Sequence, residues 1–156
     1  MTPDDLFACA GQIALVGWSL LILGPRRFAW LNLLPALVLP AILSALYAVL
    51  VLTRFAAGQG GFGSLADVRL LFSDDWLLLA GWIHYLAFDL MIGARIAARL
   101  DRVGVGRLLQ AFLLPFIFLF GPLGALIAGL AEGMHRTFGA ASARIPSLKP
   151  LAGEPT

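Results

Sequence analysis

Long apolar runs alternate along the chain with short segments rich in glycine, proline and arginine. The apolar runs predict helices over about residues 5–23, 31–53, 74–99 and 108–131. Each run approaches or exceeds the roughly 20 residues that a helix needs to cross the hydrocarbon core of a bilayer. The one long connection, residues 54–72, is glycine-rich and ends in a short amphipathic helix that is expected to lie in the membrane interface. The pattern predicts an all-α membrane protein, a bundle of four transmembrane helices with a short interfacial helix before the third.

The composition supports a bilayer as the solvent of this chain. Hydrophobic residues make up 60% of the sequence and charged residues 13%, whereas a soluble domain has about 25% charged residues. Residues 1–134 are predicted to form one transmembrane domain, and residues 135–156 a polar, flexible C-terminal tail. The net charge is only +2, with arginines at the ends of apolar runs. This pattern is typical of topology signals and not of a nucleic-acid-binding surface.

The N-terminal segment indicates a retained helix. Its first residues, Met-Thr-Pro-Asp-Asp, are acidic, whereas a cleaved signal peptide begins with positive charge. Thr2 is a suitable N-cap and Pro3 a suitable first helical residue. The single cysteine, Cys9, excludes an intrachain disulfide and a cysteine-based metal site. No metal and no cofactor is expected.

The basic residues divide evenly between the two sides of a bundle with four complete spans. One side has Arg26, Arg27, Arg99, Arg102 and Arg107, and the other has Arg54, Arg69, Arg136, Arg144 and Lys149. The first hairpin breaks the tie, because acidic residues precede the first helix and arginines follow it. The positive-inside rule then predicts that both termini lie outside the cytoplasm.

The third apolar run, Trp76 to Arg99, carries three ionisable side chains inside a predicted span: His84, Asp89 and Arg95. Such groups cost a few kcal/mol each near the bilayer centre, and they usually face a bundle interior or a wet cavity. We therefore expect the functional site on this helix. Asp89 is near mid-span and is expected to point into the bundle, whereas Arg95 is close enough to the helix end to reach the headgroups.

Helical geometry places these side chains on two faces. At 100° per residue, Asp89 lies about 20° from Trp82 and about 40° from Tyr85. His84 lies about 140° from Asp89 but only about 20° from Arg95. A reaction centre that uses both His84 and Asp89 therefore needs groups from other helices.

Polar groups on other runs are candidates to complete such a centre. The second run contains Asn32 and Tyr47, and the fourth begins near Gln110. Prolines inside these runs release backbone carbonyls; Pro122 leaves the carbonyl of Phe118 without its helical donor. The second run is either a kinked packing helix or the wall of a cavity.

Two sequence blocks resemble a known family. The W-x-H-x-L-A-x-D-L-x-x-G signature of the neoxanthin synthase family, also called abscisic-acid-deficient-4-like, resembles Leu79-Ala80-Gly81-Trp82-Ile83-His84-Tyr85-Leu86-Ala87-Phe88-Asp89-Leu90 followed by Gly93. The second block of that family resembles Phe120-Gly121-Pro122-Leu123-Gly124. The resemblance, to bacterial members in particular, covers about residues 32–130.

The resemblance implies four membrane helices and a role in xanthophyll metabolism. In the plant members, the proposed reaction converts a 5,6-epoxide carotenoid into an allenic one. An acid must protonate the epoxide oxygen and a base must remove a proton from the neighbouring polyene carbon, but no redox cofactor is needed. The implied catalytic residues are His84 and Asp89. The implied substrate-binding residues are Trp82, Tyr85, Asn32, Tyr47, Arg95 and Gln110.

Three functions remain open from the sequence. The first is a cofactor-independent isomerase that acts on a carotenoid or other polyene lipid. The second is a non-catalytic carotenoid- or lipid-binding subunit, favoured by the small number of reactive groups. The third is a small proton-coupled transporter, favoured by Asp89 and the proline-broken helices. In a fourth interpretation, His84 and Asp89 only hydrogen-bond neighbouring helices and fix the bundle.

The expected surroundings follow from the same observations. The protein is expected to be a multi-pass protein of a bacterial inner membrane, in contact with the bilayer and with a polyene lipid. A second copy of the chain or a carotenoid-pathway enzyme is the expected protein partner, and no nucleic acid is expected.

Overall fold

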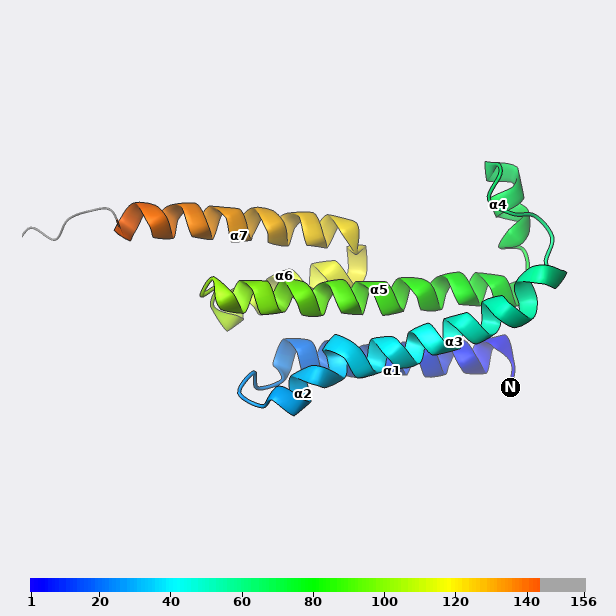
Figure 1. Cartoon of the computed structure of the whole chain (residues 1–156), viewed down its shortest axis with the longest axis horizontal. Coiled ribbons are helices and arrows are strands. Elements are labelled where there is room, and N and C mark those ends of the chain that lie inside the picture. Colours follow the sequence, from blue (N-terminus) through cyan, green and yellow to red (C-terminus); the bar gives the residue numbers. More distant parts are fainter. Residues whose placement is uncertain (144–156) are drawn as a thin grey trace, which may run out of the picture.

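The computed structural model describes residues 1–143, and this part of the chain contains helices and no strand (Figure 1). The elements are α1 (Pro3–Leu23), α2 (Ala29–Leu33), η1 (Leu34–Val38), α3 (Leu39–Arg54), η2 (Phe55–Ala57), α4 (Leu65–Leu71), α5 (Asp75–Arg102), α6 (Arg107–Phe120) and α7 (Pro122–Ala143). Because α2, η1, α3 and η2 follow one another directly, they form one bent rod. By length and composition, three helical segments of the described residues can cross a membrane: Pro3–Leu23, Ala29–Ala57 and Asp75–Arg102.

Two helices begin with the caps that their sequences predict. At the start of α1, the N–H of Asp5 donates to the Thr2 hydroxyl at 3.2 Å, and the N–H of Thr2 donates to the Asp5 carboxylate at 2.8 Å. Pro3 follows as the first helical residue. At the start of α4, the N–H of Asp67 donates to the Ser64 hydroxyl at 3.1 Å. These bonds satisfy N–H groups that have no helical partner.

The second span bends at its prolines without breaking. Pro35 and Pro40 are both buried, and η1, which contains Pro35 and ends two residues before Pro40, is a π-helical turn. In this turn the N–H of Leu39 donates to the Leu34 carbonyl, five residues back. A proline removes a donor from the helix, and a wider π turn accommodates the missing bond. The second span is therefore a kinked helix, and its α3 part also lines a cavity described below.

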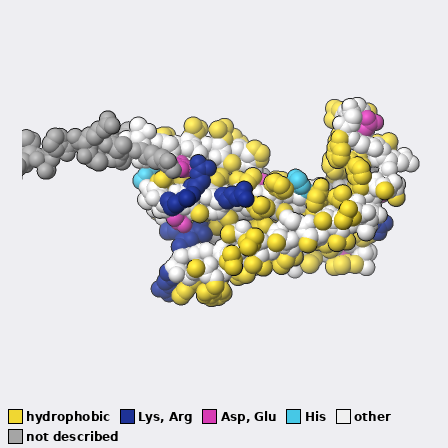
Figure 2. All heavy atoms as spheres, viewed as in Figure 1, with side chains coloured by type: hydrophobic (Ala, Val, Ile, Leu, Met, Phe, Trp, Pro, Cys, Tyr) yellow, Lys and Arg dark blue, Asp and Glu magenta, His cyan; other side chains and the backbone are white. Residues whose placement is uncertain are grey.

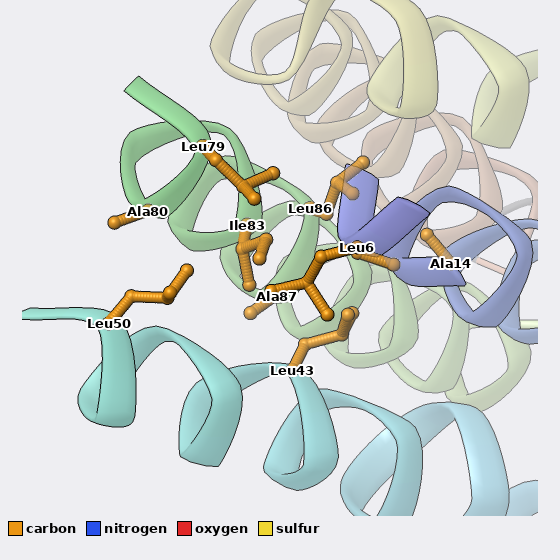
Figure 3. Close-up of a cluster of buried hydrophobic side chains, with 10 residues drawn as sticks. Leu6, Ala14, Leu43, Leu50, Leu79, Ala80, Ile83, Leu86 and Ala87 are labelled. Atoms are coloured by element: carbon orange, nitrogen blue, oxygen red, sulfur yellow. The ribbon is translucent and has the colours of Figure 1, made fainter. Parts of the chain in front are cut away.

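Helix α5 is the centre of the bundle, since it contacts α1, α3, α6 and α7. Figure 3 shows the cluster that joins α5 to α1 and α3, formed by Leu6, Ala10, Ala14, Leu43, Leu50, Leu79, Ala80, Ile83, Leu86 and Ala87. The alanines let the helices approach closely, and the larger side chains fill the space beside them. Inside a bilayer, such close packing and not transfer out of water stabilises the contact between helices.

The predicted fourth transmembrane helix, residues 108–131, is two helices. Gly121 has φ +41° and ψ −102°, and α7 starts at Pro122 and turns back along α6 and α5 (Figure 1). Residues other than glycine rarely adopt this backbone conformation, and Pro122 has no N–H with which to continue α6. Helix α6 has 14 residues, a length of about 21 Å, and cannot span a core of about 30 Å. The α6–α7 hairpin therefore corrects the prediction of a complete fourth span.

The end of the bundle opposite the N-terminus is held together by arginines, and we call it the basic end. Arg26 Nε lies 3.2 Å from a carboxylate oxygen of Asp101. Arg107 donates to two carbonyls at the end of α1, Ile22 at 2.8 Å and Gly24 at 3.1 Å. Burial, and after it the positive charge of Arg107, lowers the pKa of Arg26, but a guanidinium keeps its charge at neutral pH. Figure 2 shows arginine side chains gathered toward this end.

The two ends of the described chain lie at opposite ends of the bundle. Helix α7 ends on the side away from the N-terminus (Figure 1). The sequence prediction placed both termini on one side of the membrane, whereas Met1 and Ala143 lie at opposite ends of the bundle. Helix α7 runs past the predicted helix end, and the remainder of the predicted tail, residues 144–156, lies outside the described residues.

Candidate functional site

A cavity of about 510 Å³ lies between α3, α4 and α5, at the end of the bundle from which α4 projects (Figure 1). Its walls are mainly aromatic and aliphatic, and they consist of Tyr47, Val51, Phe55, Phe62, Leu71, Phe72, Leu77, Ala80, Gly81 and His84. We call it the α3–α4–α5 pocket. Of these side chains, Tyr47 and His84 are the ones with polar groups. An apolar cavity with a few polar groups is typical of a small-molecule site.

His84 forms part of the α5 wall and meets aromatic rings on two sides. Its ring centroid lies 5.2 Å from that of Tyr47, with the planes at 60°, and 4.6 Å from that of Phe88, with the planes at 22°. Gly81, one turn before His84, lies against Phe72, the residue that follows α4, because a methyl group there would be 3.0 Å from the Phe72 ring. The missing side chain at Gly81 thus leaves room for the Phe72 ring beside α5.

Asp89 is buried on a different face of α5, with 6% of its surface exposed. It faces the corner of the α6–α7 hairpin, since a methyl group on Gly121 would lie 3.0 Å from both of its carboxylate oxygens. Within the described residues, Oδ2 of Asp89 has no hydrogen-bond partner. The corner is the N-terminus of α7, where free N–H groups and the helix dipole favour a nearby carboxylate. Asp89 points into the bundle as predicted, but its neighbour is this corner and not a polar side chain of the second run.

Tyr85, one turn before Asp89, ties α5 to α6. Its hydroxyl donates to the Phe118 carbonyl at 2.9 Å. This is the carbonyl that Pro122 leaves without a helical donor, so the predicted free acceptor has found a partner on α5. The Trp82 ring lies 5.4 Å from the Tyr85 ring and is 43% exposed. Trp82 therefore borders the surface between α5 and α1, outside the α3–α4–α5 pocket.

We expect Tyr85→Phe to lower the free energy of unfolding by about 1 kcal/mol, because the Phe118 carbonyl loses its donor while the ring contacts remain. Thermal unfolding in detergent measures the change. Tyr47→Phe is the matched control, since the Tyr47 hydroxyl makes no hydrogen bond to other residues of the 1–143 segment; its effect is expected to be below about 0.5 kcal/mol. Equal losses in the two variants would contradict a structural role for the Tyr85 bond.

Two predicted binding residues lie at the basic end, away from the pocket. The Asn32 side chain donates to the backbone carbonyl of Arg26 at 2.7 Å. Gln110 is 1% exposed and donates to Asp101 at 2.7 Å and to the Val105 carbonyl at 3.0 Å. Both amides hold turns between helices, and neither lines the α3–α4–α5 pocket.

The predicted site residues on or near α5 fall into separate groups. His84 and Tyr47 meet in the pocket. Asp89 and Tyr85 meet the α6–α7 hairpin instead. Arg95 is exposed on the face of α5 that carries His84, about 16 Å further along the helix. The structure does not bring His84 and Asp89 into one centre.

Sequence reasoning missed Glu132 on α7. This residue is 5% exposed, and its Oε2 lies 3.3 Å from Arg99 Nε. A predicted helix end at residue 131 placed Glu132 just outside the span, where an acid needs no partner. The reversal at Gly121 instead lays α7 along α5 and buries the carboxylate. The sequence signal for this reversal was the Gly121-Pro122 pair, which the sequence prediction placed inside one helix of residues 108–131.

The pocket and the Gly121 corner both lie within the region that matches a known protein family. The ABA DEFICIENT 4-like family matches residues 5–127, from the first turn of α1, through the pocket and the Gly121 corner, into α7. The match extends further toward the N-terminus than the motif resemblance predicted. Neither the curated proteins nor the solved structures yield a match. With most of its 156 residues matched and with long apolar helices, the chain is a membrane protein that belongs to the ABA DEFICIENT 4-like family.

Proposed function

We propose that the protein is an enzyme of carotenoid metabolism that isomerises the epoxide-bearing end group of a polyene lipid in the α3–α4–α5 pocket. The observation that carries the proposal is the pairing of His84 with Tyr47 in a cavity with otherwise apolar walls. The centroids of the two rings are 5.2 Å apart. Membership of the family supports the link to xanthophylls.

The position of the pocket fits a substrate that is dissolved in the membrane. His84 lies nine residues after Asp75 at the start of α5, or about 14 Å along the helix. Aromatic side chains of the pocket walls, Phe62 and Phe72, are exposed at its edge. A ring at the end of a polyene can thus enter from the lipid without crossing water, and the polyene itself stays among apolar side chains.

His84 is able to catalyse both proton transfers of the isomerisation. As an imidazolium it donates a proton to the epoxide oxygen while the carbon–oxygen bond breaks. As a neutral imidazole it then removes the proton from the neighbouring polyene carbon, and the electrons of that C–H bond form the new double bond of the allene. One proton is given and one is taken, so the product is an isomer of the substrate and His84 returns to its first state. In this proposal the Tyr47 hydroxyl donates a hydrogen bond to the epoxide oxygen.

Asp89 has a different role in this proposal from the one that the sequence suggested. It is absent from the lining of the pocket and contacts the hairpin corner. We therefore assign it to positioning: its carboxylate holds the N-terminus of α7 against the middle of α5.

We expect His84→Gln to lower the rate of isomerisation at least about 100-fold, because glutamine cannot exchange a proton with the substrate. The assay incubates the reconstituted protein with a 5,6-epoxycarotenoid in vesicles and follows an allenic product of equal mass by chromatography. His135→Gln is the control, since His135 is the second histidine and is exposed on α7. An unfolding temperature close to that of the parent protein shows that His84→Gln remains folded. Full activity of His84→Gln, or no product from the parent protein, would overturn the proposal.

A non-catalytic carotenoid-binding subunit is the second candidate. It is favoured by the small number of polar groups in the pocket, which has no carboxylate near His84. The same incubation separates the two functions: a binding subunit retains the epoxycarotenoid through gel filtration and returns it unchanged.

A further inference from the structure

A stripe of side chains on α5 continues from the pocket toward the basic end. At 100° per residue, Leu77, Phe88, Met91 and Arg95 all lie within about 40° of the direction of His84. Phe88 and Arg95 are exposed, and Met91 is half-buried. In Figure 2, basic side chains are concentrated toward the end away from α4, while hydrophobic side chains cover much of the visible face. The stripe is therefore apolar where it meets the pocket and cationic at Arg95.

Arg95 lies in the part of the hydrocarbon core nearest the basic end, from which its guanidinium can reach the headgroup region. It is between six and seven residues past the midpoint of Asp75–Arg102, or about 10 Å along the helix, and so within a hydrocarbon core of about 30 Å. No carboxylate among residues 1–143 forms an ion pair with it. By contrast, Arg99, one turn after Arg95, forms an ion pair: its Nε lies 3.3 Å from Oε2 of Glu132. An unpaired charge inside the core is costly, so Arg95 is expected to pair with an anion from outside the chain, either a lipid headgroup or a bound ligand.

We propose that this stripe binds a polyene lipid that has a carboxylate at the end opposite to its ring. The ring occupies the α3–α4–α5 pocket beside His84, the polyene lies over Phe88 and Met91, and the carboxylate pairs with Arg95. This inference rests on the proposed function, because it names the substrate class of the same pocket. The eleven residues from His84 to Arg95 span about 16 Å, which is the separation of ring and carboxylate that the stripe accommodates. A two-ringed epoxycarotenoid can still use the pocket but lacks the contact with Arg95.

The chemistry of Arg95 favours a carboxylate, and the stripe fixes the direction of binding. A guanidinium matches the two oxygens of a carboxylate with two parallel hydrogen bonds. A charged group is disfavoured in the pocket, whose walls are aromatic and aliphatic. The substrate therefore binds in one direction, with its ring at the reactive histidine. A phospholipid headgroup could also neutralise Arg95, but it would need neither the pocket nor the apolar part of the stripe.

All-trans-retinoic acid and all-trans-retinol test the inference, because they share the ring and polyene and differ in the end group. Their binding to the purified full-length chain in detergent is followed by quenching of tryptophan fluorescence. We expect the parent protein to bind the acid about tenfold or more tightly than the alcohol, as a charge-assisted pair predicts. Arg95→Gln is expected to abolish this preference. Arg102→Gln is the control on the same face, about 27 Å from His84, and is expected to keep it.

Three results would overturn the inference. The first is equal affinity of the parent protein for the acid and the alcohol. The second is loss of the preference for the acid in Arg102→Gln. The third is an Arg95→Gln protein that keeps the preference for the acid while it loses co-purified anionic phospholipid. The last result would assign Arg95 to a headgroup.

A separate variant tests the pocket itself. Gly81→Leu fills the space beside Phe72 and is expected to weaken both probes equally. If Gly81→Leu binds both probes as the parent protein does, the proposed function fails with the inference. If it weakens both and the parent protein shows no preference for the acid, the inference fails alone.

Discussion

Replacing Gly121 with alanine is expected to destabilise the protein by about 3 kcal/mol or more, from two separate causes. The backbone of Gly121 has φ +41° and ψ −102°, a conformation that L residues rarely adopt, and such backbone strain costs roughly 1–3 kcal/mol. The new methyl group would also lie 3.0 Å from both oxygens of buried Asp89, and overfilling of a packed site adds about 1–3 kcal/mol. Thermal unfolding in detergent and the yield of monodisperse protein measure the effect.

Gly129→Ala and a double variant control this experiment. A methyl group on Gly129, in the same α7, meets no atom within 4 Å, and alanine there is expected to be neutral or stabilising by up to about 1 kcal/mol. Asp89→Ala combined with Gly121→Ala removes the steric conflict and leaves the backbone cost. The two substitutions should therefore be less than additive. If the two stability losses are strictly additive, or if Gly121→Ala is as stable as the parent protein, the residue at the corner is not in close contact with Asp89.

Gly93→Ala is expected to lower stability by about 2–3 kcal/mol, because it separates α1 from α5. A methyl group on Gly93 would collide with Cη2 of Trp18, whose ring is 2% exposed and also meets Phe118 at 5.4 Å between centroids. No rotamer of a buried indole ring is free to move away without opening this contact. Chemical denaturation of the purified protein gives the magnitude.

The matched control for Gly93 is Gly11→Ala on α1, where a methyl group meets nothing within 4 Å. A second variant tests the cause, since Trp18→Phe removes the atoms that collide with the new methyl group. Gly93→Ala should cost less in the Trp18→Phe protein than in the parent. An equal cost in both backgrounds would place the destabilisation elsewhere than at the contact between α1 and α5.

The helices could be predicted because their signals are local. Apolar runs of membrane length and short-range caps such as Thr2 and Ser64 act within one turn, and the structure has both caps. The reversal at Gly121 could not be predicted in the same way. A Gly-Pro pair allows either a kink in one helix or a turn between two. Contacts with Asp89 and Tyr85, which are distant in sequence, accompany the turn.

The candidate site could also be predicted only in part, because it depends on contacts between residues that are distant in sequence. Periodicity alone separated His84 from Asp89 by about 140°, and the structure places them against different neighbours. Which helix covers each face depends on how α6 and α7 pack, and a pattern within α5 contains no information on that packing. For the same reason Gln110 was expected to complete the site, whereas it holds a turn at the basic end.

The α6–α7 hairpin also decides which leaflet of the bilayer supplies the pocket. Because the chain turns back at Gly121, α7 runs toward the end that already holds Arg26, Arg27, Arg99, Arg102 and Arg107 (Figure 1). Among the described residues the positive charge is therefore divided unequally, because Arg54 and Arg69 are the basic residues at the other end. By the positive-inside rule, this imbalance predicts the basic end in the cytoplasm and Met1 outside. With that orientation, the α3–α4–α5 pocket opens in the outer half of the membrane, and the substrate of the proposed function would reach His84 from the outer leaflet.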